Sequence, residues 1–135
     1  MTAEWIADVS HRLEMAADIL REIAARAWVS SGLLRLRLCF LGQRIAQASR
    51  RLAFAMQITS NSRRRYLRRI EDLHAAAVRC LGLTCTEECG AAYEGVEIVA
   101  SELASIAAEL RTLEHLHAER LEIAEQARPH IGGAS

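Results

Sequence analysis

Arginine is the residue type with the clearest chemical potential in this sequence. All seventeen basic residues are arginine, and a guanidinium can bind a carboxylate or a phosphate through two parallel hydrogen bonds. Five of them fall within seven residues: Arg63, Arg64, Arg65, Arg68 and Arg69. They stand at the start of an expected helix, where the helix dipole disfavours cations. We therefore expect this group to bind an acidic partner, either a protein or a nucleic acid.

Glutamate and histidine form a second pattern. Glu71 and His74 are three residues apart in one apolar-periodic segment, and Glu114 and His117 repeat that spacing in another. Such a pair pointing inward from each of two helices is how carboxylate-bridged di-iron bundles hold their metal. To that extent the pattern resembles the ferritin-like family, and the resemblance implies an iron site. It covers these four residues and the helix count, because the second segment contains no carboxylate to complete the set. The alternative is two partly buried histidines, each hydrogen-bonded to a glutamate.

Four cysteines offer another candidate metal site. Cys85 and Cys89 are four residues apart and share a helix face. Cys80 precedes Cys85 by five residues. Three thiols supply most of a zinc or copper site, with Cys39 or a histidine as the remaining ligand. The alternative is that Cys39 and Cys80 are small core residues and the other two are free thiols. An even number of cysteines without a signal peptide does not imply disulfides.

Catalytic motifs are scarce. The sequence has no glycine-rich phosphate loop, no lysine for a Schiff base and no nucleophile elbow. Arg69-x4-His74 and Arg111-x5-His117 resemble the loose Arg/His spacing of HEPN-type ribonucleases, which are all-α, but seventeen arginines make such a match almost unavoidable. We expect a protein that is not an enzyme, and no small-molecule substrate is indicated.

Four helices are expected to position these residues. Apolar residues recur every three or four positions, often with a seven-residue, coiled-coil-like repeat, along 6–27, 34–55, 67–81 and 96–124. In the second of these segments a further apolar set indicates burial on more than one side. This set consists of Leu33, Leu36, Phe40 and Phe54.

The helix ends also carry signals. Gly82 is expected to end the third helix as its C′ residue, and Thr84 with Glu87 forms a capping box that opens the fourth. The fourth segment, of about 43 residues, either bends near Gly90 and Gly95 or projects beyond the bundle. Because a projecting helix needs a partner, we expect a homodimer.

These segments predict an all-α fold, an antiparallel four-helix bundle with a long C-terminal helix. Residues 1–128 form its single domain, and 129–135 form a flexible tail. The longest uncharged stretch is 52–62, well short of the roughly 20 residues of a membrane-spanning helix. Acidic residues near the N-terminus argue against a secretory signal. We expect a cytoplasmic protein of bacterial or phage origin.

Charge is strongly segregated along the chain although the net charge is zero. Residues 29–82 contain eleven arginines and two acids, whereas 83–135 contain three arginines and ten glutamates. An internal explanation is that arginines spaced by seven in the second helix pair with glutamates spaced by seven in the fourth. The residues concerned are Arg37, Arg44 and Arg51 on one side and Glu102 and Glu109 on the other.

The sequence therefore predicts a non-enzymatic interaction or regulatory protein whose arginine-rich second and third helices engage an acidic partner. No cofactor is expected on this hypothesis. The alternative is a metal-binding bundle that holds iron, zinc or copper through its Glu/His set or its thiols. A weaker alternative is an Arg/His ribonuclease.

Overall fold

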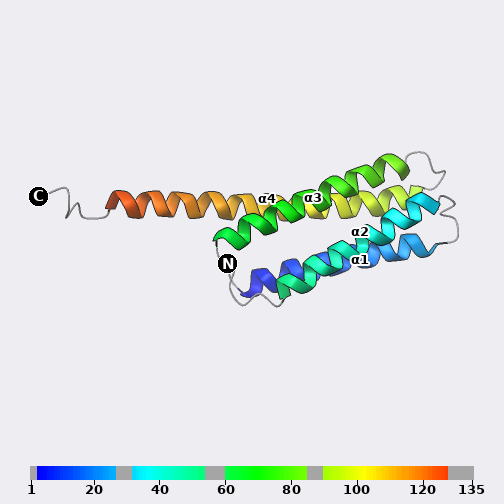
Figure 1. Cartoon of the computed structure of the whole chain (residues 1–135), viewed down its shortest axis with the longest axis horizontal. Helices are drawn as coiled ribbons and strands as arrows, with labels where there is room; N and C mark the ends of the chain where they lie inside the picture. The colour runs from blue at the N-terminus through cyan, green and yellow to red at the C-terminus, as the bar shows by residue number, and fades with distance from the viewer. Residues whose placement is uncertain (1–2, 27–31, 54–59, 85–89, 128–135) are drawn as a thin grey trace, which may run out of the picture.

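The computed structural model describes residues 3–26, 32–53, 60–84 and 90–127. These residues contain four helices, α1 (Ala3–Ala25), α2 (Gly32–Ala53), α3 (Ser60–Thr84) and α4 (Gly90–Ala127) (Figure 1). No strand occurs among them, so the predicted all-α class is confirmed. The expected tail at 129–135 lies outside the described residues.

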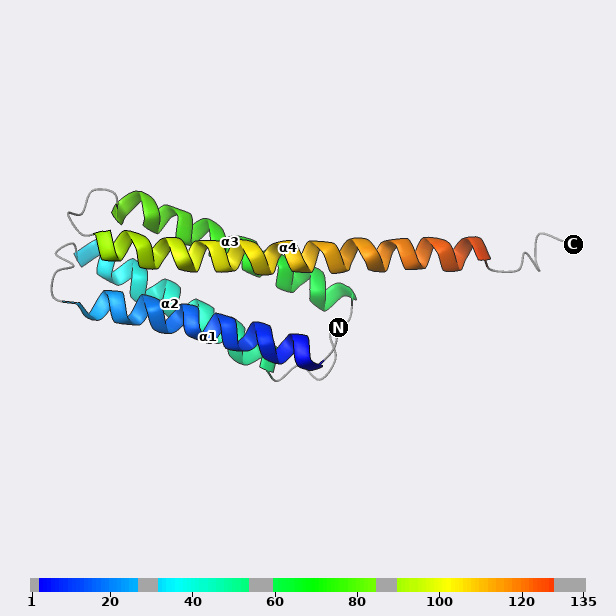
Figure 2. The ribbon, with the colours of Figure 1, turned by 180° about the vertical axis from the view of Figure 1, so that it is seen from behind.

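Consecutive helices run in opposite directions and form an antiparallel bundle (Figure 1). α1 packs on α2 and α3 packs on α4, and these two hairpins meet along α1/α4 and α2/α3. The described parts of α2 and α4 do not contact each other, and neither do those of α1 and α3. The bundle thus has an α2/α3 face, nearer the viewer in Figure 1, and an opposite α1/α4 face, nearer the viewer in Figure 2.

This arrangement overturns one set of predicted ion pairs. We expected Arg37, Arg44 and Arg51 of α2 to pair with two glutamates of α4, but these two helices lie on a diagonal. An arginine of α1 contacts both glutamates instead. A seven-residue repeat identifies the face of a helix, and it does not identify the neighbour which that face meets.

The apolar stripes predicted from the spacing form the core. Burying a leucine stabilises a fold by about 2 kcal/mol, and every helix contributes side chains that are essentially inaccessible to solvent. Among the largest are Leu13 and Leu20 of α1, Leu38 and Ile45 of α2, Ile70 and Leu73 of α3, and Leu103 and Leu110 of α4.

Small residues bring α1 and α2 close together. A Cβ added at Gly42 would lie 3.5 Å from the carbonyl oxygen of Ala17. Further along, Ser49 Oγ donates to the carbonyl of Ser10 at 2.7 Å, and Ser10 Oγ donates to that of Ser49 at 3.1 Å. This reciprocal pair links α2 to α1 at one position along both helices.

The boundary between the last two helices differs from the prediction. α3 continues through Gly82 to Thr84, because Gly82 stays in helical conformation rather than adopting a positive φ. Thr84 is the last residue of α3, so it does not open α4. Its Oγ1 donates to the carbonyl of Leu81 at 2.8 Å. Glu87, the other half of the expected capping box, lies outside the described residues.

α4 projects beyond the other helices instead of bending (Figures 1 and 2). It is 38 residues long and passes through Gly95 as one continuous helix. There it packs against α1, and a Cβ at this position would lie 3.5 Å from Ile19 Cγ2 and would collide with Ile23. No helix in the described part of the chain is both long and apolar enough to cross a bilayer.

Candidate interaction surface

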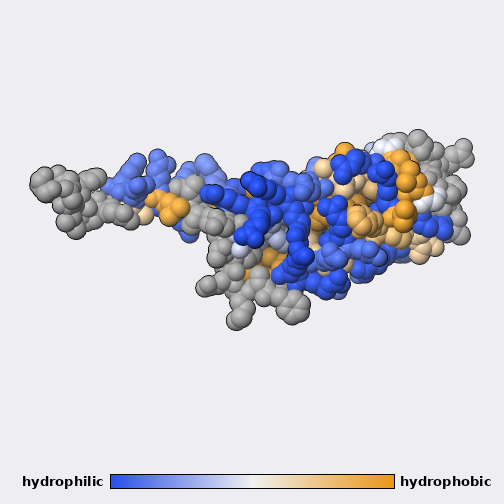
Figure 3. Space-filling model, in the orientation of Figure 1, coloured by the Kyte–Doolittle hydropathy of each residue, from blue (hydrophilic) through white to orange (hydrophobic). Residues whose placement is uncertain are grey.

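A groove of about 450 Å³ opens between α2 and α3. Its lining comes from the first half of α2 and the second half of α3, so it lies at the end of the bundle opposite the projecting part of α4 (Figure 1). In Figure 3, hydrophobic side chains gather at this end of the molecule and are interrupted by hydrophilic ones. The groove therefore combines apolar and polar surface.

Its apolar part is the second apolar set that the sequence analysis of α2 identified, and the expectation that this set is buried was wrong. Leu33, Leu36 and Phe40 are 54%, 67% and 60% exposed. The other stripe of α2 already fills the core, and α3 reaches α2 along a narrow seam only, so nothing in the described structure covers them. Phe54, the remaining member, lies outside the described residues.

Arginines surround these apolar side chains. Arg37, Arg44 and Arg79 line the groove, and Arg44 Cζ lies 5.9 Å from the centroid of the Phe40 ring in a cation–π contact. Within the described residues none of the three arginines forms an ion pair. α2 contains no acidic residue at all. The groove therefore offers apolar anchors between uncompensated positive charges.

The helix arrangement turns the segregated charge of the sequence into two faces. α2 and α3 together carry eleven arginines and two acidic residues, and these helices are neighbours. α1 and α4 together carry thirteen acidic residues and four arginines, and they are also neighbours. One side of the bundle is therefore basic and the opposite side is acidic.

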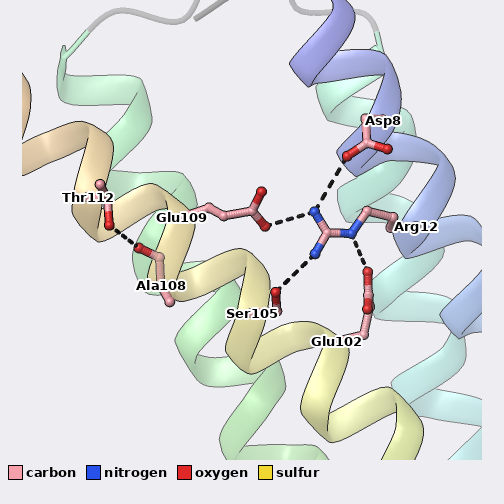
Figure 4. A network of polar contacts seen from close by, with 7 residues as sticks. All are labelled: Asp8, Arg12, Glu102, Ser105, Ala108, Glu109 and Thr112. Carbon is pink, nitrogen blue, oxygen red and sulfur yellow. Dashed lines mark hydrogen bonds and ion pairs between the residues drawn. The ribbon is translucent and has the colours of Figure 1, made fainter.

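The acidic α1/α4 seam contains its own counter-ion, Arg12 (Figure 4). Its guanidinium contacts Glu102, donates to Glu109 at 2.7 Å and to Ser105 at 3.2 Å, and approaches Asp8 at 3.5 Å. Burial by itself lowers the pKa of Arg12, but the hydrogen bonds and charges of the two glutamates outweigh burial and raise it. Arg12 thus remains charged and offsets part of the negative charge at the seam between two acidic helices.

Among the described residues, the basic α2/α3 seam has no comparable counter-ion. Its one described polar link across the helices is Tyr66 Oη, which donates to the carbonyl of Ala48 at 3.0 Å. Burial raises the pKa of Tyr66, so the phenol stays a neutral donor. Because no acidic side chain lines the groove, its arginines remain available to an anion from outside.

The arginine cluster at the start of α3 is divided between interior and surface. Arg63 is 7% exposed and donates to Glu114 of α4 at 2.5 Å, so it belongs to the interior and not to an exposed binding surface. Arg64 approaches the same carboxylate at 3.4 Å. Arg65 and Arg68 are exposed, and Arg69 is half-buried. The hydrogen bond from Arg63 lowers the pKa of Glu114.

The glutamates of the candidate iron site are engaged with arginines. Glu71 lies 3.8 Å from Arg111 Nη2. Glu114 forms ion pairs with Arg63 and Arg64. His74 is half-buried, and the side chain of His117 lies outside the described part of the structure. No group of three or more potential metal ligands occurs in the described residues.

The cysteines are likewise only partly described. Cys39 is exposed on α2, and Cys80 is buried in α3 at the edge of the groove. Burial raises the pKa of the Cys80 thiol despite nearby arginines, and this disfavours the thiolate that metals bind. Cys85 and Cys89 lie outside the described residues.

The Arg/His pairs with ribonuclease-like spacing lie on two neighbouring helices. Arg69 and His74 are both half-buried on α3. Arg111 is exposed on α4 and faces Glu71.

No protein-family model, curated protein or solved structure matches the chain.

Sequence reasoning missed two of the residues that define the two seams. Arg12 interrupts the acidic first helix between Val9 and Leu13 of the apolar stripe, and this position beside a buried stripe is the signal that it faces a neighbouring helix. Arg79 carries no comparable signal, because only the packing of α3 on α2 brings it to the groove.

Proposed function

We propose that this protein is a non-enzymatic interaction module whose α2/α3 groove binds an acidic, partly apolar segment of a protein partner. The observation that carries the proposal is the difference between the two seams. The acidic seam is partly compensated by Arg12, whereas the basic seam has arginines without described ion pairs around exposed apolar side chains.

The apolar anchors favour a protein over a nucleic acid. Leu33, Leu36 and Phe40 are spaced three and four residues apart, so they form one stripe on α2. An amphipathic helix buries its own apolar stripe in such a groove, and its acidic flanks meet the arginines. A phosphate backbone would satisfy the arginines and would leave the leucines and the phenylalanine exposed.

A labelled peptide tests this directly. The probe is a fluorescein-labelled helical peptide of about 15 residues with leucines at i, i+3 and i+7 and glutamates between them, and its binding is followed by fluorescence anisotropy. The triple variant Arg37→Gln/Arg44→Gln/Arg79→Gln should weaken binding about tenfold or more, since each rim charge contributes up to about 1 kcal/mol. These side chains make no described ion pairs and stand among like charges, so the melting temperature of the variant should not fall.

The matched control is Arg65→Gln/Arg68→Gln, which removes exposed arginines of α3 outside the groove. It should retain peptide binding. A duplex DNA of about 20 base pairs, measured at about 50 mM salt where phosphate contacts are strongest, forms the second arm. Tighter binding of DNA than of peptide, lost in the control variant, would overturn the protein-partner proposal in favour of a nucleic-acid interface at the start of α3.

A further inference from the structure

The α1/α4 face carries a second hollow, on the side of the bundle where acidic residues outnumber arginines. Met15, Ile19 and Ile98 line it together with Arg12 and Glu102, and its volume is about 180 Å³. Met15 is 53% exposed and Ile98 is 58% exposed. An adjoining hollow on the same face is lined by Glu94 and by the ion pair between Glu22 and Arg26. This face therefore presents apolar side chains beside acidic residues, some of which are paired with arginines and one of which, Glu94, has no described ion pair.

The two faces correspond in position as well as in chemistry. The hollow on the α1/α4 face involves the middle and second half of α1 and the first half of α4. It therefore lies in the same half of the bundle as the groove of the α2/α3 face, on the opposite side. The projecting part of α4 leaves at the other end (Figures 1 and 2) and obstructs neither face.

We propose that the α2/α3 face of one copy binds the α1/α4 face of a second copy. This inference rests on the proposed function, since the acidic partner of the groove is then another molecule of the same chain. Leu36 and Phe40 of one copy meet Met15 and Ile98 of the next, and the arginines of the groove meet exposed glutamates at the start of α4, Glu94 among them. The zero net charge of the chain removes any overall repulsion between copies.

The area available is that of a stable interface. A helix of about 22 residues is about 33 Å long, and two helices side by side are about 20 Å wide. Each face thus offers roughly 700 Å², close to the roughly 800 Å² per partner of a standard protein–protein interface.

The charge pattern also determines the symmetry. A two-fold dimer through either face would place arginines against arginines or glutamates against glutamates, and like charges in contact disfavour binding. Contact between different faces is heterologous, and each bound copy leaves one basic and one acidic face open. Such contacts continue into rings or open chains rather than stopping at a dimer.

The test uses two complementary variants of the full chain. Leu36→Glu/Phe40→Glu disables the basic face, and Met15→Arg/Ile98→Arg disables the acidic face. All four side chains are more than half exposed, so both variants should fold, and far-UV circular dichroism verifies this. Ile123→Arg, on the projecting part of α4, is the control for adding a charge at an exposed apolar residue.

Multi-angle light scattering supplies the readout. At about 50 mM NaCl, where charges are weakly screened, the wild type and the Ile123→Arg control should exceed twice the 15.0 kDa monomer mass as concentration rises. Each face variant alone should remain monomeric. An equimolar mixture of the two should form a one-to-one complex and grow no further, because it contains one intact pair of faces.

The outcomes separate this inference from the proposed function. A wild type that stays at 15.0 kDa, a dimer insensitive to both face variants, or a mixture that fails to associate overturns the self-association. If the acidic peptide still binds the wild type and not Leu36→Glu/Phe40→Glu, the proposed function stands with a foreign partner. If the peptide also fails to bind, both proposals fall.

Discussion

At the scale of single residues, the interior arginine of α3 shows what a buried charge requires. The Arg63 and Glu114 side chains are 9% and 19% exposed and joined at 2.5 Å, while Arg63 Nη2 is buried with no described hydrogen-bond partner. Removing one member of a buried ion pair costs more than removing both, because the remaining charge is left without compensation. The pair therefore holds α3 to α4 in one register.

The variant Glu114→Gln should be destabilised by about 3 kcal/mol at neutral pH, because it leaves the Arg63 guanidinium buried without a counter-charge. The double variant Arg63→Met/Glu114→Leu should recover to within about 1 kcal/mol of the wild type. Urea unfolding measures all three proteins. A double variant as unstable as the single one would show that packing at this site, and not the charge, is what matters.

The same pair predicts a pH dependence. The pKa of Glu114 is lowered in the folded state, so the carboxylate stabilises the fold above the ordinary glutamate pKa. This stabilisation is lost as the pH falls through the lowered value. The stability difference between wild type and Glu114→Gln should be constant near neutrality and shrink below about pH 4.3. A difference that grows on acidification would contradict the sign.

At the scale of helices, the glycines within α3 and α4 have different surroundings. A Cβ added at Gly82 meets nothing within 4 Å, whereas one at Gly95 collides with the side chain of Ile23 on α1. Glycine inside a helix is less favourable than alanine by about 1 kcal/mol. The glycine at the α1/α4 contact therefore permits close packing, and the other one does not.

Gly82→Ala should stabilise the protein by about 1 kcal/mol, because it gains helix propensity without a clash. Gly95→Ala should gain less than this or lose stability, since Ile23 must move to admit the new Cβ. Thermal unfolding of both variants makes the comparison. Equal gains would mean that Ile23 moves aside without cost.

The last part of α4 should be the least stable part of the described helices. Residues 119–127 are all exposed and extend beyond the bundle (Figure 2), and helices of fewer than about 12 residues are marginal when nothing packs on them. Amide hydrogen exchange at 119–127 should be at least about 100-fold faster than at Val99–Leu110. Protection equal to that of the core would show that another molecule covers this segment.

At the scale of the whole molecule, opposite charges lie on opposite faces. Within each hairpin an acidic helix packs on a basic one, which is favourable. Where the hairpins meet, like-charged helices face each other. Arg12 reduces the repulsion between the acidic helices α1 and α4. Between the basic helices α2 and α3, no described acidic side chain reduces it. The uncompensated side is the one that we propose binds a partner.

Arg12→Gln should destabilise the bundle by about 2 kcal/mol. Two glutamates lose a charged hydrogen bond, each worth about 1.5–3 kcal/mol when buried, but these carboxylates are 34% and 39% exposed and solvent screens both interactions. The loss should be larger at low salt, where the remaining carboxylates repel one another most. Arg21→Gln is the control, since Arg21 is exposed and pairs only with Asp18 on its own helix. Comparable losses in both variants would contradict a special role for Arg12.

Much of the architecture followed from local pattern. The spacing of Val9, Leu13 and Leu20 predicts a buried helical stripe, and all three are fully buried. The all-α class, the antiparallel order and α4 as the longest helix also follow, because helix period and loop length are properties of neighbouring residues. The start of α4 does not, since it lies at Gly90 and not at Thr84.

Tertiary structure alone decided the composition of the candidate surface. The exposure of Phe40, the arrival of Arg79 beside it, and the choice of Arg12 rather than Arg44 as partner of Glu109 all depend on which helices become neighbours. The repeat along each helix is the same whichever helix lies opposite, so the sequence pattern determined what each face carries. The close packing of α1 on α2, which leaves α2 and α4 on a diagonal, decided what each face meets.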